Sequence, residues 1–429
     1  MRKKLTTFRK WLSPGLSIKR WLLLIIVGIL FLSMGVAQVI LALDQSPSIV
    51  ASGPSSDFLI LLTLALGTVF VVIALYELND TILTAYRVQN PQPIVDAMYD
   101  QYKRKQGITV VAIGGGTGLP SVLRSLKHLT SNLSAIVTVA DDGGSSGRLR
   151  RTMGILPPGD LRNNIAALAD DEEMMTQLFQ YRFSTGDLDG HSFGNLFLTA
   201  LSDITGSMDR ALLEAARVLA VQGSVLPATL DNVTLVGEIW LPEKQGLQTV
   251  TGESEIPETG GKIERVFLEP PTTRAYPKSV QAILGADLIV IGPGSVYTSI
   301  LPSLLVNGIT EALRASNALI VYVCNVATQP GETDDFDVSD HVVALEKHVG
   351  SGLFQIVLAN NHFPSTNASA TQYVRPAQDK HEITTRYEIV YADLTDAQYP
   401  WRHDPAKLVG GLQYCFTNYQ AASLQKIKH

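Results

Sequence analysis

The hydrophobic pattern at the start of the chain is dominated by two long segments without a charged side chain, residues 21–43 and 58–76. A helix rises about 1.5 Å per residue, so each segment is about as long as the ~30 Å hydrocarbon core of a bilayer is thick. The pattern therefore predicts two transmembrane helices, which form a membrane hairpin within residues 1–80.

Charged residues around these segments predict the orientation of the hairpin. The loop at 44–57 has no lysine or arginine, and basic residues return in the predicted connector, residues 81–106. Lysine and arginine favour the cytoplasmic side, so both termini and the main domain are expected on that side of the cytoplasmic membrane. A cleaved signal peptide is the alternative for the first segment, but that segment is long and a second one follows. The basic residues before the first segment are Arg2, Lys3, Lys4, Arg9, Lys10, Lys19 and Arg20.

From residue 107 the pattern changes to short, β-branched apolar runs that alternate with helical stretches. Such runs are typical of parallel strands buried on both faces. Around residues 230–270 the pattern instead alternates like half-exposed strands, with Pro and Gly between them. We therefore predict an α/β fold for residues 107–429: a Rossmann-like, mostly parallel sheet with flanking helices and a small β-rich insertion. The predicted buried strands are 108–113, 134–140, 286–291 and 319–323.

A glycine-rich turn, Gly114-Gly115-Gly116-Thr117-Gly118, directly follows the first run and precedes a helix predicted to extend to about Leu129. Glycines let the backbone approach a phosphate, and the start of a helix offers free N–H groups. Leu119 stands where the dinucleotide fingerprint has its last glycine, which disfavours a nicotinamide dehydrogenase. The turn indicates a nucleotide site, with a purely structural tight turn as the alternative.

The second strand is followed by an unusual polar stretch, residues 141–148, which we interpret as a loop. Asp141 and Asp142 would hold either a ribose hydroxyl or Mg²⁺. Successive N–H groups of the loop would form an anion nest, and an arginine would pair with phosphate. A solvated loop with a helix cap is the structural alternative. The candidates for phosphate contact are Gly144, Ser145, Ser146 and Arg148.

Two further polar turns precede predicted helices. Asp160 is the predicted N-cap of a helix at 161–168, with Asn163 free to reach a ligand. His191 and Asn195 open the helix predicted at 196–204, and His191 would serve as a base or phosphate donor, or have a structural role.

The strand at 286–291 also ends in glycines and hydroxyls: Gly292, Gly294, Ser295 and Thr298. In open α/β sheets the ligand binds at the carboxyl ends of the strands. The separate turns are therefore interpreted together as one cleft.

The composition narrows the classes of function. The 429 residues include 34 Lys and Arg against 40 Asp and Glu, a net charge of −6, so nothing indicates a nucleic-acid partner. Cys324 and Cys415 are too few for a disulfide framework, and no Cys/His cluster suggests zinc. A reducing, cytosolic environment is expected for the main domain.

Six motifs in this order resemble the YvcK/CofD-like family, most closely its YvcK branch, the gluconeogenesis factors. The resemblance implies a Rossmann-like α/β fold, binding of a UDP-sugar such as UDP-N-acetylglucosamine, and a role in cell shape during gluconeogenic growth. The CofD branch implies an alternative, a Mg²⁺-dependent transferase of the 2-phospho-L-lactate transferase type. The motifs are IGGGTGLP (113–120), VTVADDGGSSGRLR (137–150), PPGDLRNN (157–164), GHSFGNL (190–196), GPGSVYTSILPSLLV (292–306) and TQPGET (328–333).

The resemblance also implies which residues form the site. The glycine turn, Asp141 and Asp142 match the family's nucleotide and metal region, and Arg402, in Arg402-His403-Asp404, is a plausible contact to the sugar nucleotide. No nucleophile–base pair is evident in the sequence, so a binding and regulatory protein is favoured over an enzyme. Cell-wall synthesis proteins and a second copy of the chain are further expected partners. The other matching cleft positions are Asn163, Asn195, Gly292, Gly294, Ser295 and Thr298.

Overall fold

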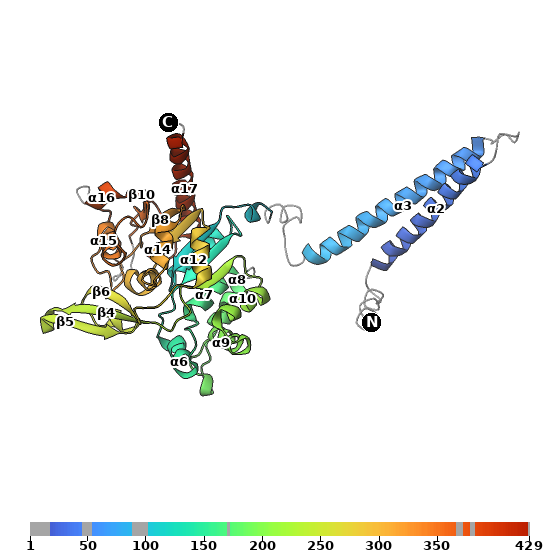
Figure 1. Cartoon of the computed structure of the whole chain (residues 1–429). Coiled ribbons are helices and arrows are strands. Elements are labelled where there is room, and N and C mark those ends of the chain that lie inside the picture. The colour runs from blue at the N-terminus through green and yellow to red at the C-terminus, as the bar shows by residue number, and fades with distance from the viewer. Residues whose placement is uncertain are drawn as a thin grey trace. The chain divides into compact units, whose positions relative to one another are not determined.

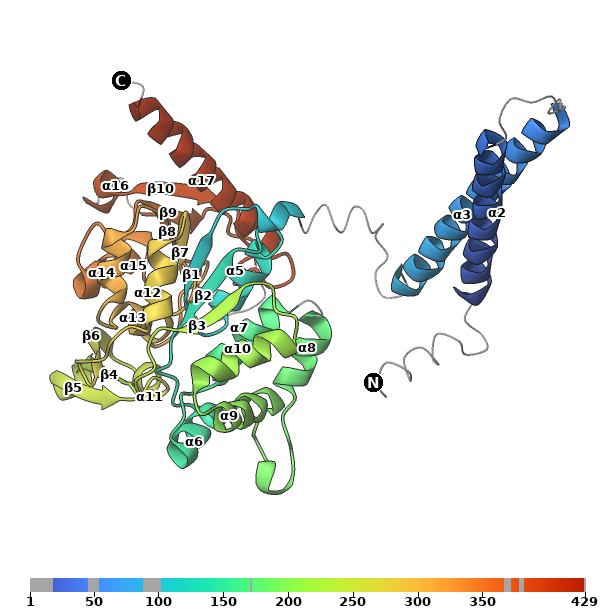
Figure 2. The same ribbon diagram turned by 45° about the vertical axis from the view of Figure 1, so that its right-hand side comes forward.

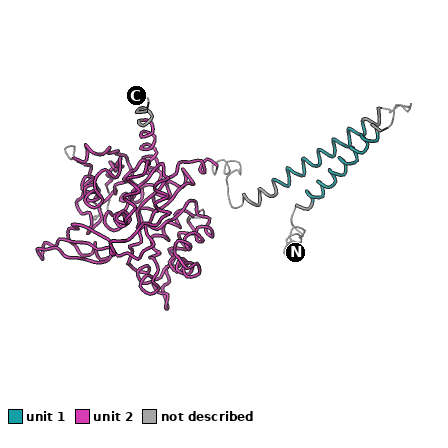
Figure 3. Tube along the Cα trace, viewed as in Figure 1, with its two compact units in different colours: residues 1–100 teal, residues 101–429 magenta. Residues whose placement is uncertain are grey.

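The computed structural model describes residues 18–44, 54–87, 102–169, 172–365, 372–377 and 382–427. The chain separates into two compact units, residues 1–100 and 101–429 (Figure 3). Each unit is described separately below. Most of the predicted connector, residues 88–101, lies outside the described residues.

Unit 1 contains two long apolar helices, α2 (Ile18–Asp44) and α3 (Pro54–Arg87), which pack on each other. A β-carbon added to Gly28 would lie 3.0 Å from the carbonyl oxygen of Gly67, so the glycines let the two backbones approach closely. The two predicted spans fall within α2 and α3, and both helices are long and apolar enough to cross a membrane. Large apolar side chains cover the outside of the pair; Leu61, for example, is 67% exposed.

Unit 2 is built on a seven-stranded parallel sheet with the order β10-β9-β8-β7-β1-β2-β3 (Figures 1 and 2). The chain runs outward from β1 through β2 to β3, and then returns to the other side of β1 with β7. The strand order therefore reverses between β1 and β7, where ligands bind in doubly wound folds. The strands are β1 (Val110–Gly114), β2 (Leu133–Val137), β3 (Ser224–Pro227), β7 (Leu288–Ile291), β8 (Leu319–Val323), β9 (Ile356–Asn360) and β10 (Glu388–Ala392).

The central strands form the core of this unit. Every residue of β1, β7 and β8 is buried, because helices cover both faces of the sheet. The predicted α/β fold is confirmed, although the second predicted strand ends at Val137, three residues earlier than expected.

Helices flank the sheet; α10 packs on β3, and α9 packs on α10, α8 and α6 (Figure 2). On the apolar stripe predicted for α5, Leu119, Leu123 and Leu126 are buried. The helices are α5 (Gly118–Leu126), α6 (Gly144–Met153), α7 (Gly159–Leu168), α8 (Glu172–Gln180), α9 (Phe193–Thr205), α10 (Met208–Val218), α11 (Glu255–Glu258), α12 (Pro277–Leu284), α13 (Leu301–Leu304), α14 (Ile309–Ala315), α15 (Val338–Val349), α16 (Glu382–Arg386) and α17 (Pro405–Ile427).

A separate antiparallel sheet of β4 (Thr234–Leu241), β5 (Gly246–Thr251) and β6 (Lys262–Glu269) forms the insertion, with the order β5-β4-β6. The buried side chain of Ile256, in α11, packs against Gly237 of β4. The small β-rich insertion predicted around residues 230–270 is therefore present.

Candidate functional site

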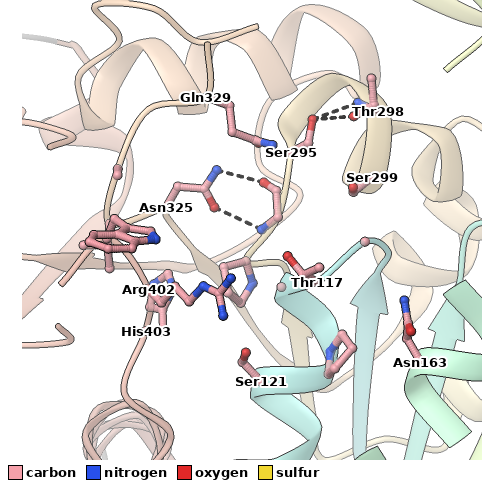
Figure 4. A pocket seen from close by; sticks show the side chains of 18 of the residues that line it. Thr117, Ser121, Asn163, Ser295, Thr298, Ser299, Asn325, Gln329, Arg402 and His403 are labelled. Carbon is pink, nitrogen blue, oxygen red and sulfur yellow. Dashed lines mark hydrogen bonds between the residues drawn. The ribbon is translucent and has the colours of Figure 1, made fainter. Parts of the chain in front are cut away.

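A cavity of about 1040 Å³ opens at the point where the strand order reverses. Its wall combines the turns that follow β1 (116–118), β7 (293–295) and β8 (325–330) with the segment before α17 (401–403). These segments are far apart in the sequence, but they meet because parallel strands end at the same edge of the sheet. Figure 4 shows the side chains of Thr117, Asn325 and Arg402 around this space.

The glycine turn packs tightly against the turn after β7. A β-carbon on Gly118 would lie 2.2 Å from the carbonyl oxygen of Pro293, which is far inside van der Waals contact. The side chain of Asn325 fixes the second turn, because its Oδ1 accepts from the N–H of Gly294 (3.0 Å) and its Nδ2 donates to the Gly294 carbonyl (2.9 Å; Figure 4). Backbone groups of both turns are thereby held at the cavity wall.

Two predicted hydroxyls converge on the buried carboxylate of Glu332, which lies in the quoted motif TQPGET but was not among the predicted site residues. The Ser295 hydroxyl donates to Glu332, and the Thr298 hydroxyl lies 2.9 Å from Oε1 of the same carboxylate. Ser295 also accepts from the N–H of Thr298 at the start of the π-helical turn Val296–Ile300. Burial raises the pKa of Glu332, while these donors oppose that shift.

Four arginines line the cavity: Arg124, Arg162, Arg182 and Arg402. Arg162 donates to Ser192 Oγ (2.5 Å) and to the Asn163 side chain (2.9 Å). The Arg402 guanidinium lies 5.5 Å from the centre of the Tyr399 ring and, as Figure 4 shows, its side chain points into the cavity. One carboxylate, Glu253, lines the described part of the wall, so the arrangement favours an anionic ligand.

Asp160 holds the glycine turn, and the prediction that it caps its own helix is wrong. Helix α7 begins at Gly159, and the Asp160 carboxylate accepts from the N–H of Gly116 (2.7 Å). Burial raises the pKa of Asp160 to about 6. The missed residue Glu253 has a pKa raised to about 9 by its burial and then by the carboxylates around it, Asp141 first.

The two acids predicted to bind Mg²⁺ have different partners. Oδ1 of Asp141 accepts from the N–H of Gly143 (2.9 Å), and burial raises the pKa of Asp141. Oδ1 of Asp142 accepts from both the N–H (3.1 Å) and the hydroxyl (2.9 Å) of Ser254, so Asp142 anchors the insertion. Among the described residues no group of three or more His, Cys, Asp or Glu is placed to hold a metal. Mg²⁺ needs only one or two carboxylates beside phosphate oxygens, and its binding stays a prediction.

The stretch predicted as an open loop is largely helical, because α6 begins at Gly144. Arg148 donates to the Asp189 carbonyl (2.9 Å) and does not line the cavity. Ser145 lies 3.0 Å from Nδ1 of His191, and the Asn195 amide donates to it (3.1 Å). In place of the predicted loop, the segment therefore presents the first N–H groups of a helix.

The predicted residues thus divide into two groups. Those that line the cavity are Gly116, Thr117, Gly118, Asn163, Gly294, Ser295, Thr298 and Arg402. The remaining ones stand behind the wall or around the start of α6: Gly114, Gly115, Asp141, Asp142, Gly144, Ser145, Ser146, Arg148, His191, Asn195 and Gly292.

Other lining residues were not predicted, among them Gln329, Trp401 and His403. His403 is held by its Nε2 on the carbonyl of Cys324 (3.1 Å), and burial lowers its pKa to about 4. Signals for two of them were present in the sequence: Gln329 lies in the motif TQPGET (328–333) after β8, and His403 adjoins Arg402 in the short segment quoted for the family.

Comparison with known proteins shows the family of the chain. The family model described as 2-phospho-L-lactate transferase CofD matches residues 110–395.

The chain belongs to the CofD family.

Two relatives in this family carry the name gluconeogenesis factor. One from Nostoc sp. strain PCC 7120, named "Putative gluconeogenesis factor", is 43% identical over 430 residues, which cover 93% of this chain and 90% of the relative. That coverage exceeds residues 101–429 alone, so the similarity extends into the N-terminal unit. The "Gluconeogenesis factor" of Bacillus subtilis strain 168 is 51% identical over 253 residues, 59% of this chain and 78% of the relative.

A solved structure extends the comparison to three dimensions. The crystal structure of a UPF0052 family protein from Bacillus halodurans has a TM-score of 0.67 and 44% identity to this CofD family member, covering 72% of this chain and 99% of that chain. Its fold therefore supports the α/β architecture described above.

Proposed function

We propose that this chain is a regulatory protein that binds a UDP-sugar, of the UDP-N-acetylglucosamine kind, in the cavity at the reversal of strand order. The observation that carries the proposal is the combination of a glycine turn and four arginines in one cavity. A role in cell shape during gluconeogenic growth is proposed with it, supported by relatives named gluconeogenesis factor.

The chemistry of the wall suits both halves of such a ligand. A diphosphate carries negative charges that guanidinium groups pair with in bidentate geometry. A sugar and a uracil offer hydroxyl and amide groups, for which Asn163, Asn325 and Gln329 provide matching donors and acceptors. The volume of about 1040 Å³ is at the upper end of ordinary small-molecule sites, as a nucleotide sugar requires.

Side-chain partners at the wall favour binding over turnover. The Ser295 hydroxyl already donates to a carboxylate, and the one histidine among the described lining residues, His403, uses Nε2 on a backbone carbonyl. Neither arrangement provides an activated nucleophile in the cavity.

A Mg²⁺-dependent transferase of the 2-phospho-L-lactate type is the second candidate. The match to the CofD family model and the buried carboxylates behind the glycine turn favour it. Asp141 and Asp142 would hold the metal, which neutralises phosphate charge when bound. Positioning and charge would then replace a nucleophile–base pair.

Titration calorimetry on the full-length protein in detergent tests the binding proposal. We expect saturable binding of UDP-N-acetylglucosamine, weakened about tenfold by Arg402→Ala, because a charge-assisted contact contributes about 1.5 kcal/mol. Arg217→Ala is the control, since Arg217 is exposed and paired with Glu214. Failure of every UDP-sugar to bind would exclude the proposal, and Mg²⁺-dependent product formation would favour the transferase.

We also propose that unit 1 anchors the protein in the cytoplasmic membrane, with unit 2 on the cytoplasmic side. The exposed apolar surface of α2 and α3 supports this, because water would solvate it at a large free-energy cost. We expect the full-length chain to stay with membranes in alkaline carbonate, and a variant without residues 1–100 to be released. Extraction of the full-length chain by carbonate would contradict the anchor. Contacts with a second copy or with cell-wall synthesis proteins remain compatible with it.

A further inference from the structure

The first turn of α6 presents a serine beside a histidine, away from the wall of the cavity. Ser145 Oγ lies 3.0 Å from Nδ1 of His191, although the two residues are 46 positions apart in the sequence. The serine follows β2 through a short turn, at the second residue of α6. The segment 143–147 reads Gly-Gly-Ser-Ser-Gly, which has the G-x-S-x-G spacing of a nucleophilic serine between a strand and a helix.

The glycines of this segment are needed for the tight turn. A β-carbon on Gly147 would lie 1.8 Å from the carbonyl oxygen of Asp142, so only glycine lets the first turn of α6 pack so closely on the backbone of Asp142. Gly144 has a φ of +44°, a conformation that side chains rarely adopt. The turn therefore places Ser145 among the first N–H groups of a helix, which lack partners within the helix and stabilise negative charge.

The hydrogen bonds around Ser145 direct its proton toward the histidine. The Asn195 amide donates to Ser145 Oγ (3.1 Å), which occupies an acceptor position of the hydroxyl. The hydroxyl proton is then available to His191 Nδ1, the acceptor nitrogen of the tautomer protonated on Nε2. Burial, and then the charge of Arg148, lower the pKa of His191, which favours the neutral imidazole, the form that can accept a proton.

The adjacent serine offers a matched comparison within the same turn. Ser146 is as buried as Ser145, both being 4% exposed, and it also accepts from the Asn195 amide (3.3 Å). Its hydroxyl, however, is hydrogen-bonded to the carboxylate of Asp141, and no bond from it to an imidazole is found in the described part of the chain. The position of His191 therefore distinguishes one hydroxyl from the other.

We propose that Ser145 is a nucleophile and His191 its general base, acting on a carboxylic ester or thioester. Ser145 Oγ attacks the carbonyl carbon while its proton passes to His191 Nδ1, and the first N–H groups of α6 stabilise the oxyanion. The bond to the alcohol or thiol then breaks, and His191 returns the proton to that leaving group. Water hydrolyses the acyl-serine and releases a carboxylic acid.

Charge in the same turn favours an acyl over a phosphoryl substrate. Asp141 and Asp142 lie directly before the turn, and without a bound cation their carboxylates repel an incoming phosphate dianion. An ester carbonyl carries no net charge until it is attacked. Because Ser145 is 4% exposed, we expect the reaction to be slow.

A fluorophosphonate probe tests the nucleophile on the full-length protein in detergent, with peptide mass spectrometry locating the adduct. We expect one adduct, on Ser145, formed at least about a hundredfold more slowly in His191→Gln, because general-base catalysis contributes that much or more. Ser145→Ala should form no adduct, and Ser146→Ala should still carry its adduct on Ser145. A folded wild-type protein without an adduct on Ser145, or equal labelling of His191→Gln, would overturn the proposal.

Two chromogenic substrates test the acyl assignment. We expect p-nitrophenyl acetate to be hydrolysed by the wild type and by Ser146→Ala, and p-nitrophenyl phosphate not to be. Hydrolysis of the phosphate alone would overturn the ester assignment. Binding of UDP-N-acetylglucosamine, measured on the same samples, reports separately on the cavity, and thermal melting shows whether each variant is folded.

Discussion

Gly118→Ala is expected to lower the free energy of unfolding by about 1–3 kcal/mol and to weaken UDP-sugar binding by about thirtyfold, the equivalent of about 2 kcal/mol. The new β-carbon would lie 2.2 Å from the carbonyl oxygen and 2.7 Å from the carbonyl carbon of Pro293. Both are backbone atoms, so no side-chain rotation relieves the clash. The two turns must separate, and both line the cavity.

Gly114→Ala is the matched control in the same glycine turn. Its β-carbon would have nothing closer than Leu119 Cβ at 3.8 Å, and Gly114 does not have a positive φ. We expect near wild-type unfolding in urea and near wild-type calorimetric binding. Equal effects of the two substitutions would show that the contact with Pro293 does not determine the geometry of the site.

Glu332→Ala is expected to lower the free energy of unfolding by about 2–4 kcal/mol, because it removes a buried acceptor from several donors at once. The hydroxyls of Ser295 and Thr298 and two backbone N–H groups are bonded to this carboxylate. Urea unfolding of the full-length protein, followed by a signal from unit 2, measures the change.

Glu332→Gln separates hydrogen bonding from charge at this position, and Glu243→Ala is a control at another carboxylate. Glu332→Gln keeps one acceptor oxygen and the volume of the side chain, so we expect roughly half of the loss. Glu243→Ala removes an exposed carboxylate, and a change within about 0.5 kcal/mol is expected. If Glu332→Ala were as mild as Glu243→Ala, the Ser295 and Thr298 hydroxyls would have other partners in solution.

The patterns of apolar and polar residues along the chain predicted strands whose burial follows those patterns. The run at 319–323 coincides with β8, because every residue of a strand covered on both faces is apolar. The alternating pattern at 263–268 lies within β6, whose outer face is exposed. The prediction failed at 141–148, since a pair of glycines that suggests a loop is also needed where a helix starts in a confined space.

In the site, too, neighbouring residues in the sequence did not reveal the partners of individual side chains. Aspartate is a residue type that often caps helices, but the carboxylate of Asp160 accepts a hydrogen bond from the N–H of Gly116, 44 residues away. Glu253 is in the insertion, a segment without any motif that indicates a ligand, and it lines the cavity next to Ser254, whose N–H donates to Asp142. Both hydrogen bonds join residues far apart in the sequence, so a local stretch of sequence does not reveal them.

The sequence by itself determined the two apolar helices, the parallel sheet, the glycine turn after β1 and the family, because each depends on residues that are adjacent or periodic in the chain. Only the tertiary structure decided which polar residues share the cavity, that Glu332 binds Ser295 and Thr298, and that Ser145 lies beside His191. The physical reason is that these contacts join segments brought together by the order of strands in the sheet and by the packing of α6 on α9. Local residue preferences do not encode that proximity.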